Sequence, residues 1–142
     1  MAELAAIHIM EAMSTALAEQ LIEVRRSLTR PHRPIPGDGH CQFRSVTTQC
    51  PDYGYEAYKR LRTDVADHVL ANSDHFLPFF TGNHQQRQLA AWIRKVRTEA
   101  WGDNTSLDAA CRILRRPFAV WRRGTVLQPP TVFMPSDYDP QN

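Results

Sequence analysis

The stretch from residue 31 to residue 39 constrains the fold most, because three prolines and two glycines interrupt the chain there. Proline fixes φ and lacks an N–H group, so a helix cannot run through this stretch, while glycine allows a sharp turn. Cys41 follows the turn directly, and apolar residues then recur at helical spacing from Phe43 to Cys50. The pattern predicts an extended connection, a tight turn and a helix that begins at or near Cys41.

A cysteine between a glycine turn and the start of a helix is where a thiol nucleophile would be placed. Unpaired backbone N–H groups at a helix start favour the thiolate, and the same groups can hold an oxyanion. The alternative is that Cys41 is a small buried apolar residue, which is common for a lone cysteine. The spacing alone leaves both interpretations open.

Two motifs resemble the ovarian tumour (OTU) family of cysteine proteases. Asp38–Val46 reads DGHCQFRSV and agrees at every fixed position with the nucleophile motif of that family, Asp-Gly-X-Cys-X-Phe-Arg followed by a small residue. In OTU domains a Trp-Gly-Asp or Trp-Gly-Gly sequence then precedes a helix and a strand. Here Trp101-Gly102-Asp103 is followed by a predicted helix over Leu107–Leu114 and a predicted strand over Phe118–Trp121. The resemblance covers about residues 17 to 134.

This resemblance implies an α/β fold of the α+β type, in which a small β-sheet packs between helices as in papain-like cysteine proteases. It also implies hydrolysis of the isopeptide or peptide bond at the C-terminus of ubiquitin or a ubiquitin-like protein. Cys41 would attack the carbonyl carbon, and backbone N–H groups of Asp38, Gly39, His40 and Cys41 would form the oxyanion hole. Asp38 would shape the active-site loop and can also cap the helix. No cofactor or metal is required, and the expected partner is ubiquitin or polyubiquitin.

The catalytic base is the position where the sequence departs from the family. In OTU domains this histidine lies near the C-terminal end, on the last strand, but this sequence has no histidine after His84. A fragment, a pseudoenzyme that binds ubiquitin without cutting, and a permuted enzyme are the three explanations. In the permuted enzyme His8 or His32 would serve, so the general base is unassigned and His8 is a candidate. His40 adjoins Cys41 and adjacent residues rarely face each other. The other histidines are interpreted as surface or packing residues: His68, His75 and His84.

The apolar spacing predicts helices first and strands late in the chain. We expect an amphipathic helix over residues 3–28, which makes residues 1–30 an N-terminal helix packed on a protease domain of residues 31–142. The remaining expectations are helices over residues 56–70, 85–100 and 107–114, an aromatic connection over 72–81 tucked against the core, and strands over 118–121 and 131–134. Thr105 or Ser106 is expected to cap the helix over 107–114.

Composition narrows the function classes. A chain of 142 residues fits one domain. The three cysteines, Cys41, Cys50 and Cys111, contain no Cys-X-X-Cys pair, which argues against a disulfide framework and a structural zinc site and favours a reducing, cytoplasmic compartment. We see no signal peptide and no transmembrane segment. Arginine pairs could bind nucleic acid, but they are scattered, so this alternative is the weakest.

Overall fold

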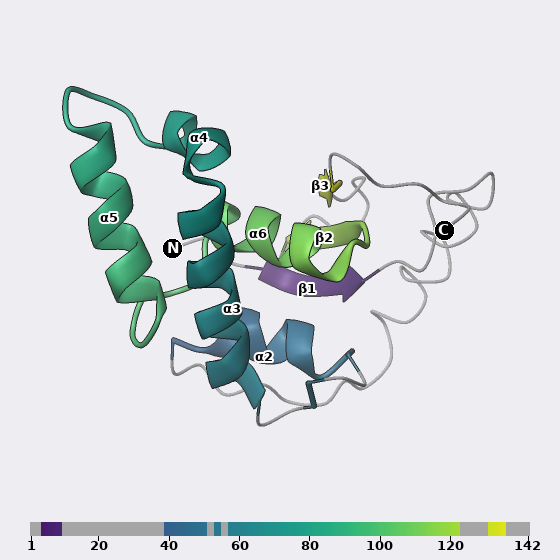
Figure 1. Cartoon of the computed structure of the whole chain (residues 1–142). Coiled ribbons are helices and arrows are strands. Elements are labelled where there is room, and N and C mark those ends of the chain that lie inside the picture. The colour runs from purple at the N-terminus through teal and green to yellow at the C-terminus, as the bar shows by residue number, and fades with distance from the viewer. Residues whose placement is uncertain (1–3, 10–38, 51–52, 55–56, 123–130, 136–142) are drawn as a thin grey trace.

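The computed structural model describes residues 4–9, 39–50, 53–54, 57–122 and 131–135, and these form a mixed α+β fold (Figure 1). This confirms the predicted fold class. The described elements, in chain order, are β1 (Leu4–Ile9), α2 (Cys41–Thr47), α3 (Tyr58–Ala71), α4 (Ser73–Phe76), the 3₁₀ helix η2 (Leu77–Phe79), α5 (Gln85–Val96), α6 (Asn104–Leu114), β2 (Phe118–Arg122) and β3 (Thr131–Phe133).

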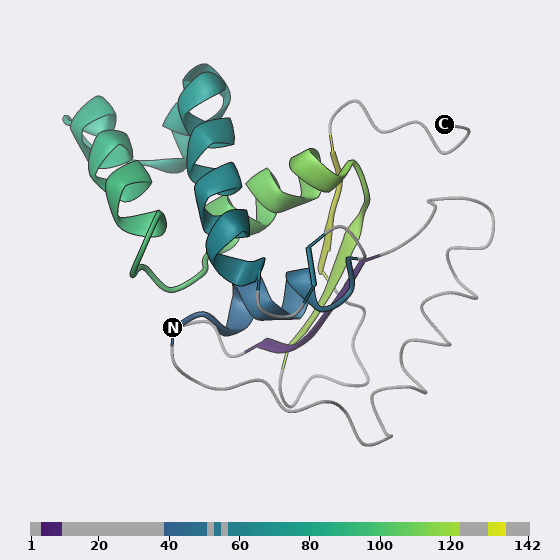
Figure 2. The same ribbon diagram turned by 60° about the horizontal axis from the view of Figure 1, so that its bottom comes forward.

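The sheet is antiparallel, with strand order β1-β2-β3. Ile7 pairs with Val120, Ile9 with Phe118, and Phe118 with Phe133. These five residues belong to the hydrophobic core or pack against it, because side chains two positions apart in a strand share one face. Figure 2 shows the helices gathered on one side of the sheet. The sheet therefore presents one apolar face to the helical layer.

Helix α3 forms the centre of the helical layer. Its residues Leu61, Val65 and Val69 are fully buried, and they recur at four-residue steps, as expected for one face of a helix. Helices α2, α5 and α6 all contact α3. Helix α2 also contacts β1, so the helix that begins at Cys41 lies between α3 and the sheet.

The predicted helix over residues 3–28 is wrong at its start, because residues 4–9 form β1. The strand is held on both edges. One edge pairs with β2, and on the other the Gln49 side chain accepts a hydrogen bond from Ile9 N–H at 3.0 Å and donates to the Ile7 carbonyl at 2.7 Å. Residues 10–28 lie outside the described part of the chain. The division into residues 1–30 and 31–142 stays a prediction, although β1 shares a sheet with β2.

The other helices and strands agree with the sequence prediction, with shifts at their ends. The connection over 72–81 contains α4 and η2, and Phe76 is fully buried whereas Phe79 is 44% exposed. The N-cap residue of α6 is neither Thr105 nor Ser106, although Ser106 takes part in the capping box. Asp103 is the N-cap, and its carboxylate accepts the Ser106 N–H at 2.9 Å while Asp103 N–H donates to Ser106 Oγ at 2.8 Å. A carboxylate reaches the free N–H groups of the first turn from this position.

Candidate active site

The turn before α2 has the geometry that the glycine motif predicts. Gly39 has φ of +90°, a conformation that favours glycine because other residues suffer a steric clash there. His40 is the N-cap of α2, and its carbonyl accepts the Arg44 N–H at 2.9 Å. Helix α2 consequently begins at Cys41, immediately after the turn.

A buried arginine of α3 holds this turn in place. Arg62 is 1% exposed. It donates from Nη2 to the Gly39 carbonyl at 2.9 Å, from Nε to Nδ1 of His40 at 3.0 Å, and from Nη1 to the Val96 carbonyl at 2.8 Å. Its Cζ also lies 4.2 Å from the ring centroid of Phe43. These hydrogen bonds compensate the desolvation of the guanidinium, which would be costly for an unpaired buried charge.

The second sequence motif packs directly against the first. The Trp101 indole would lie 3.6 Å from a β-carbon built on Gly39. A β-carbon on Gly102 would overlap the side chain of Gln42, so Trp101-Gly102 requires glycine at its second position. Gln42, 6% exposed, donates to the Asp103 carbonyl at 3.2 Å and accepts from Ser106 Oγ. The two motifs that carry the family resemblance thus form one site.

The three cysteines differ in access. Cys111 is fully buried, and burial raises the pKa of its thiol to about 12. Cys41 and Cys50 are partly exposed, and none of the three is in a disulfide. Cys41 is therefore a partly exposed residue at the start of α2 that forms no disulfide.

The imidazole of His40 is oriented toward α3. Its Nδ1 accepts from Arg62, and because arginine is only a donor, the neutral ring carries its proton on Nε2. The ring centroid lies 4.7 Å from that of Tyr58. His40 is thus part of the support of the turn.

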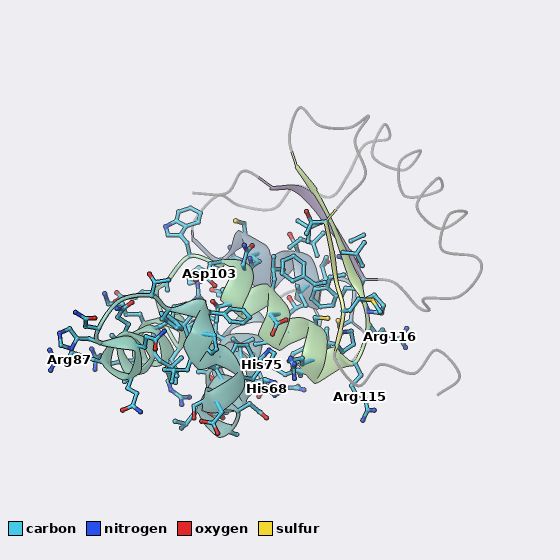
Figure 3. All side chains as sticks on the ribbon, turned by 90° about the horizontal axis from the view of Figure 1, so that it is seen from above. His68, His75, Arg87, Asp103, Arg115 and Arg116 are labelled. Carbon is cyan, nitrogen blue, oxygen red and sulfur yellow. The ribbon has the colours of Figure 1, made fainter. Side chains whose placement is uncertain are left out.

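Two other histidines, His68 of α3 and His75 of α4, lie beside the C-terminal end of α6 (Figure 3). Arg112 can only donate, so the His75 Nδ1 accepts from it at 3.2 Å and the His75 Nε2 donates to Asp108 at 3.0 Å. Burial, followed by the charge of Arg112, lowers the pKa of His68. Figure 3 shows Asp103 at the start of α6, with His68 and His75 beside the other end of that helix. The structure separates these histidines from the turn before Cys41, and their interpretation as surface or packing residues stays a prediction.

Three residues singled out in the sequence fall partly or wholly outside the described part. Asp38 and His32 lie outside it. His8 lies on β1 opposite Ala119, but its side chain is not described. In the described ranges no group of three or more His, Cys, Asp or Glu residues could hold a metal ion.

Sequence reasoning missed Arg62 and Gln42. A signal for Arg62 was present, because it falls among Leu61, Val65 and Val69 on the apolar stripe of α3, where a charged residue needs partners. Gln42 carries no such signal. Its importance depends on the contact with Gly102, which only the folded chain creates.

A profile of the OTU-like cysteine protease family matches residues 36–140. The chain belongs to the OTU family. A solved structure, that of the OTUD1 OTU domain, superimposes with a TM-score of 0.54 at 21% sequence identity, covering 83% of this chain and 75% of that one. The OTU fold predicted from the two motifs is thereby confirmed.

The curated relatives have OTU names, and that of OTUD6B includes the word deubiquitinase. Deubiquitinase OTUD6B of Xenopus laevis is 30% identical over 117 residues, which cover 78% of this chain and 37% of that protein. OTU domain-containing protein 6A of Mus musculus is 29% identical over 145 residues, covering 90% of this chain and 48% of that protein. The chain therefore spans less than half the length of these OTU relatives.

No helix in the described ranges is long and apolar enough to cross a membrane.

Proposed function

We propose that this OTU domain is a cysteine-type deubiquitinase that hydrolyses the isopeptide or peptide bond after the C-terminal glycine of ubiquitin or a ubiquitin-like protein. The observation that supports it best is the turn before α2. Gly39, His40, Gln42 and Phe43 are each fixed by contacts with α3 or with the Trp101 segment. Cys41 stands among them with its side chain partly exposed.

In this reaction the base takes the proton of the Cys41 thiol. The thiolate then forms a C–S bond with the scissile carbonyl carbon, and the carbonyl oxygen takes up the electron pair of the C=O π bond. Backbone N–H groups of residues 38–41 stabilise that oxyanion. The C–N bond then breaks, and the leaving lysine amine takes a proton from the base. Water hydrolyses the thioester, which returns the thiol and releases the ubiquitin carboxylate. The deubiquitinase names of the relatives support ubiquitin as the substrate.

The general base stays unassigned. His8 is the candidate taken from the sequence, and it lies on β1, a strand that contacts α2. The base must lie within hydrogen-bond reach of the sulfur, about 2.6–3.2 Å or one water away.

The test is labelling with ubiquitin that carries a C-terminal alkyl bromide, followed by cleavage of diubiquitin. We expect an adduct on Cys41, located by mass spectrometry, that Cys41→Ala abolishes. Cys50→Ala is the matched control, because Cys50 is the other partly exposed thiol, and it should leave labelling unchanged. Labelling of Cys50 in place of Cys41 would refute the proposed nucleophile. Ubiquitin binding without any adduct would identify a binding module instead. Loss of diubiquitin cleavage in His8→Ala, with labelling retained, would assign the base.

A further inference from the structure

We propose that Arg62 is a positioning residue of this site: its buried guanidinium fixes the Gly39–His40 peptide so that the His40 N–H is presented to the carbonyl oxygen of the substrate. The inference rests on the proposed function, because it requires Cys41 to attack a carbonyl group. Arg62 itself touches no reacting atom.

The orientation of the Gly39–His40 peptide plane follows from its hydrogen bond to Arg62. In a trans peptide the C=O and N–H bonds point in opposite directions, and the described part of the chain contains no cis peptide. The Gly39 carbonyl points to α3, since it accepts from Arg62 Nη2 at 2.9 Å. The His40 N–H is therefore directed away from α3.

Without this hydrogen bond the same peptide would have an alternative orientation. Rotation of this peptide plane changes ψ of Gly39 and φ of His40, and Gly39, at φ of +90°, accepts widely different ψ values because it has no Cβ. An unrestrained Gly39–His40 peptide can rotate and exchange the positions of its C=O and N–H groups. A carbonyl oxygen would then face the place where the oxyanion forms, and the two negative oxygens would repel each other.

The three hydrogen bonds of Arg62 explain why this residue must be arginine. The guanidinium bonds three acceptors at once, on the turn (Gly39 and His40) and at the end of α5 (Val96). Its planar, rigid set of donors suits such an arrangement, whereas a lysine ammonium is a single point charge. The Val96 bond ties the guanidinium to an element other than the turn, so its orientation is fixed before substrate arrives.

The experiment compares two ubiquitin probes on the wild-type chain, Arg62→Lys and Arg62→Met. Ubiquitin aldehyde reacts with the thiolate to give a hemithioacetal, whose oxygen occupies the oxyanion position. Ubiquitin with a C-terminal alkyl bromide alkylates the sulfur with release of bromide, and no oxyanion forms. Arg60→Met is the matched control, because Arg60 lies on the same helix with a side chain 60% exposed.

We expect Arg62→Lys to weaken the equilibrium affinity for ubiquitin aldehyde by about 100-fold, the scale of one lost oxyanion donor. The rate of alkylation should change by less than about threefold, because that transition state lacks the oxyanion. Since both probes need a folded ubiquitin site and Cys41, alkylation by the same sample shows that the variant is folded. If Arg62→Met fails to fold, Arg62→Lys carries the test.

Equal losses with both probes, or no loss with either, would overturn the inference and leave Arg62 as a residue of the core. Wild-type protein that takes the alkyl bromide but not the aldehyde overturns it as well. Wild-type protein that reacts with neither probe refutes the proposed function, and the inference with it. A loss confined to the aldehyde in the Arg62 variants, and absent in Arg60→Met, supports the inference.

Discussion

Replacing Gly102 by alanine places a β-carbon inside the side chain of Gln42, at 2.5 Å from its Cβ and closer still to its Cδ and Oε1. The Cβ of Gln42 is fixed to helix α2, so the overlap cannot be relieved by rotating the end of the side chain. The backbone of Gly102 is outside the left-handed region. The expected loss in the free energy of unfolding therefore comes from steric overlap and not from backbone strain.

The magnitude follows from two contributions. Overpacking a well-packed site costs about 1–3 kcal/mol. Displacement of Gln42 also breaks its buried hydrogen bonds with the Asp103 carbonyl and Ser106, and each buried polar group left unpaired costs about 1–3 kcal/mol. Because the amide can recover part of this by moving, we expect Gly102→Ala to lower the free energy of unfolding by roughly 2–5 kcal/mol.

The assay is urea unfolding monitored by circular dichroism in a double-mutant cycle. Gln42→Gly removes all three overlapping atoms, so in that background Gly102→Ala should cost less than about 1 kcal/mol. Gly54→Ala is the control for backbone strain alone, because Gly54 has φ of +82° and a β-carbon built on it would meet no heavy atom within 4 Å; its expected cost is about 1–2 kcal/mol. Equal costs of Gly102→Ala in both Gln42 backgrounds would refute the steric reasoning.

Three further predictions concern stability and are read from urea unfolding. Phe76→Ala removes a fully buried ring and should cost about 3–5 kcal/mol, whereas Phe79→Ala, at a ring 44% exposed, should cost about 1 kcal/mol; equal costs would contradict the assigned burial. Asp103→Ala removes the capping box of α6 and should cost about 0.5–2 kcal/mol. The control Asp67→Ala breaks one exposed ion pair and should cost no more than about 1 kcal/mol. Burial raises the pKa of Cys111 from 9.0 to about 12, so the unfolded thiol ionises first and stability should fall as pH rises from about 9 toward 12. Cys111→Ala should make this fall shallower, and an unchanged slope would assign it to other groups.

The helical layer could be predicted from the sequence because the signal for each helix lies within its own residues. The apolar residues of α3, α5 and α6 recur at helical spacing, and this spacing needs no knowledge of the rest of the chain. The β1 strand shows the opposite case. Leu4, Ile7 and Met10 fit a helical step, while Ile7 and Ile9 fit a strand. Only pairing with β2, at the other end of the described chain, decides between them.

The sequence predicted the part of the site that neighbouring residues form, which is the turn before α2 and the start of that helix. The Gly39–Cys41 turn and the helix start agree with the glycine motif, because neighbouring residues determine both the backbone conformation of a turn and the apolar spacing of a helix. The support of this turn by Arg62 and Gln42 depends on contacts between separate elements. The same reason explains the cap of α6. Ser106 is part of the capping box, but the N-cap is Asp103, which also accepts a hydrogen bond from Trp92 at 2.8 Å.

The pairing of β1 with β2 has a consequence for synthesis of the chain on the ribosome. Among the described elements β1 is made first, and its partner strand is one of the last to emerge. The helices between them can form local contacts early, whereas the sheet requires closure of a loop that spans nearly the whole domain, which slows folding. Until β2 emerges, Ile7 and Ile9 lie on an unpaired strand, the kind of segment that recruits other chains into aggregates. A pause in translation just before residue 118 should therefore be more harmful than one after it.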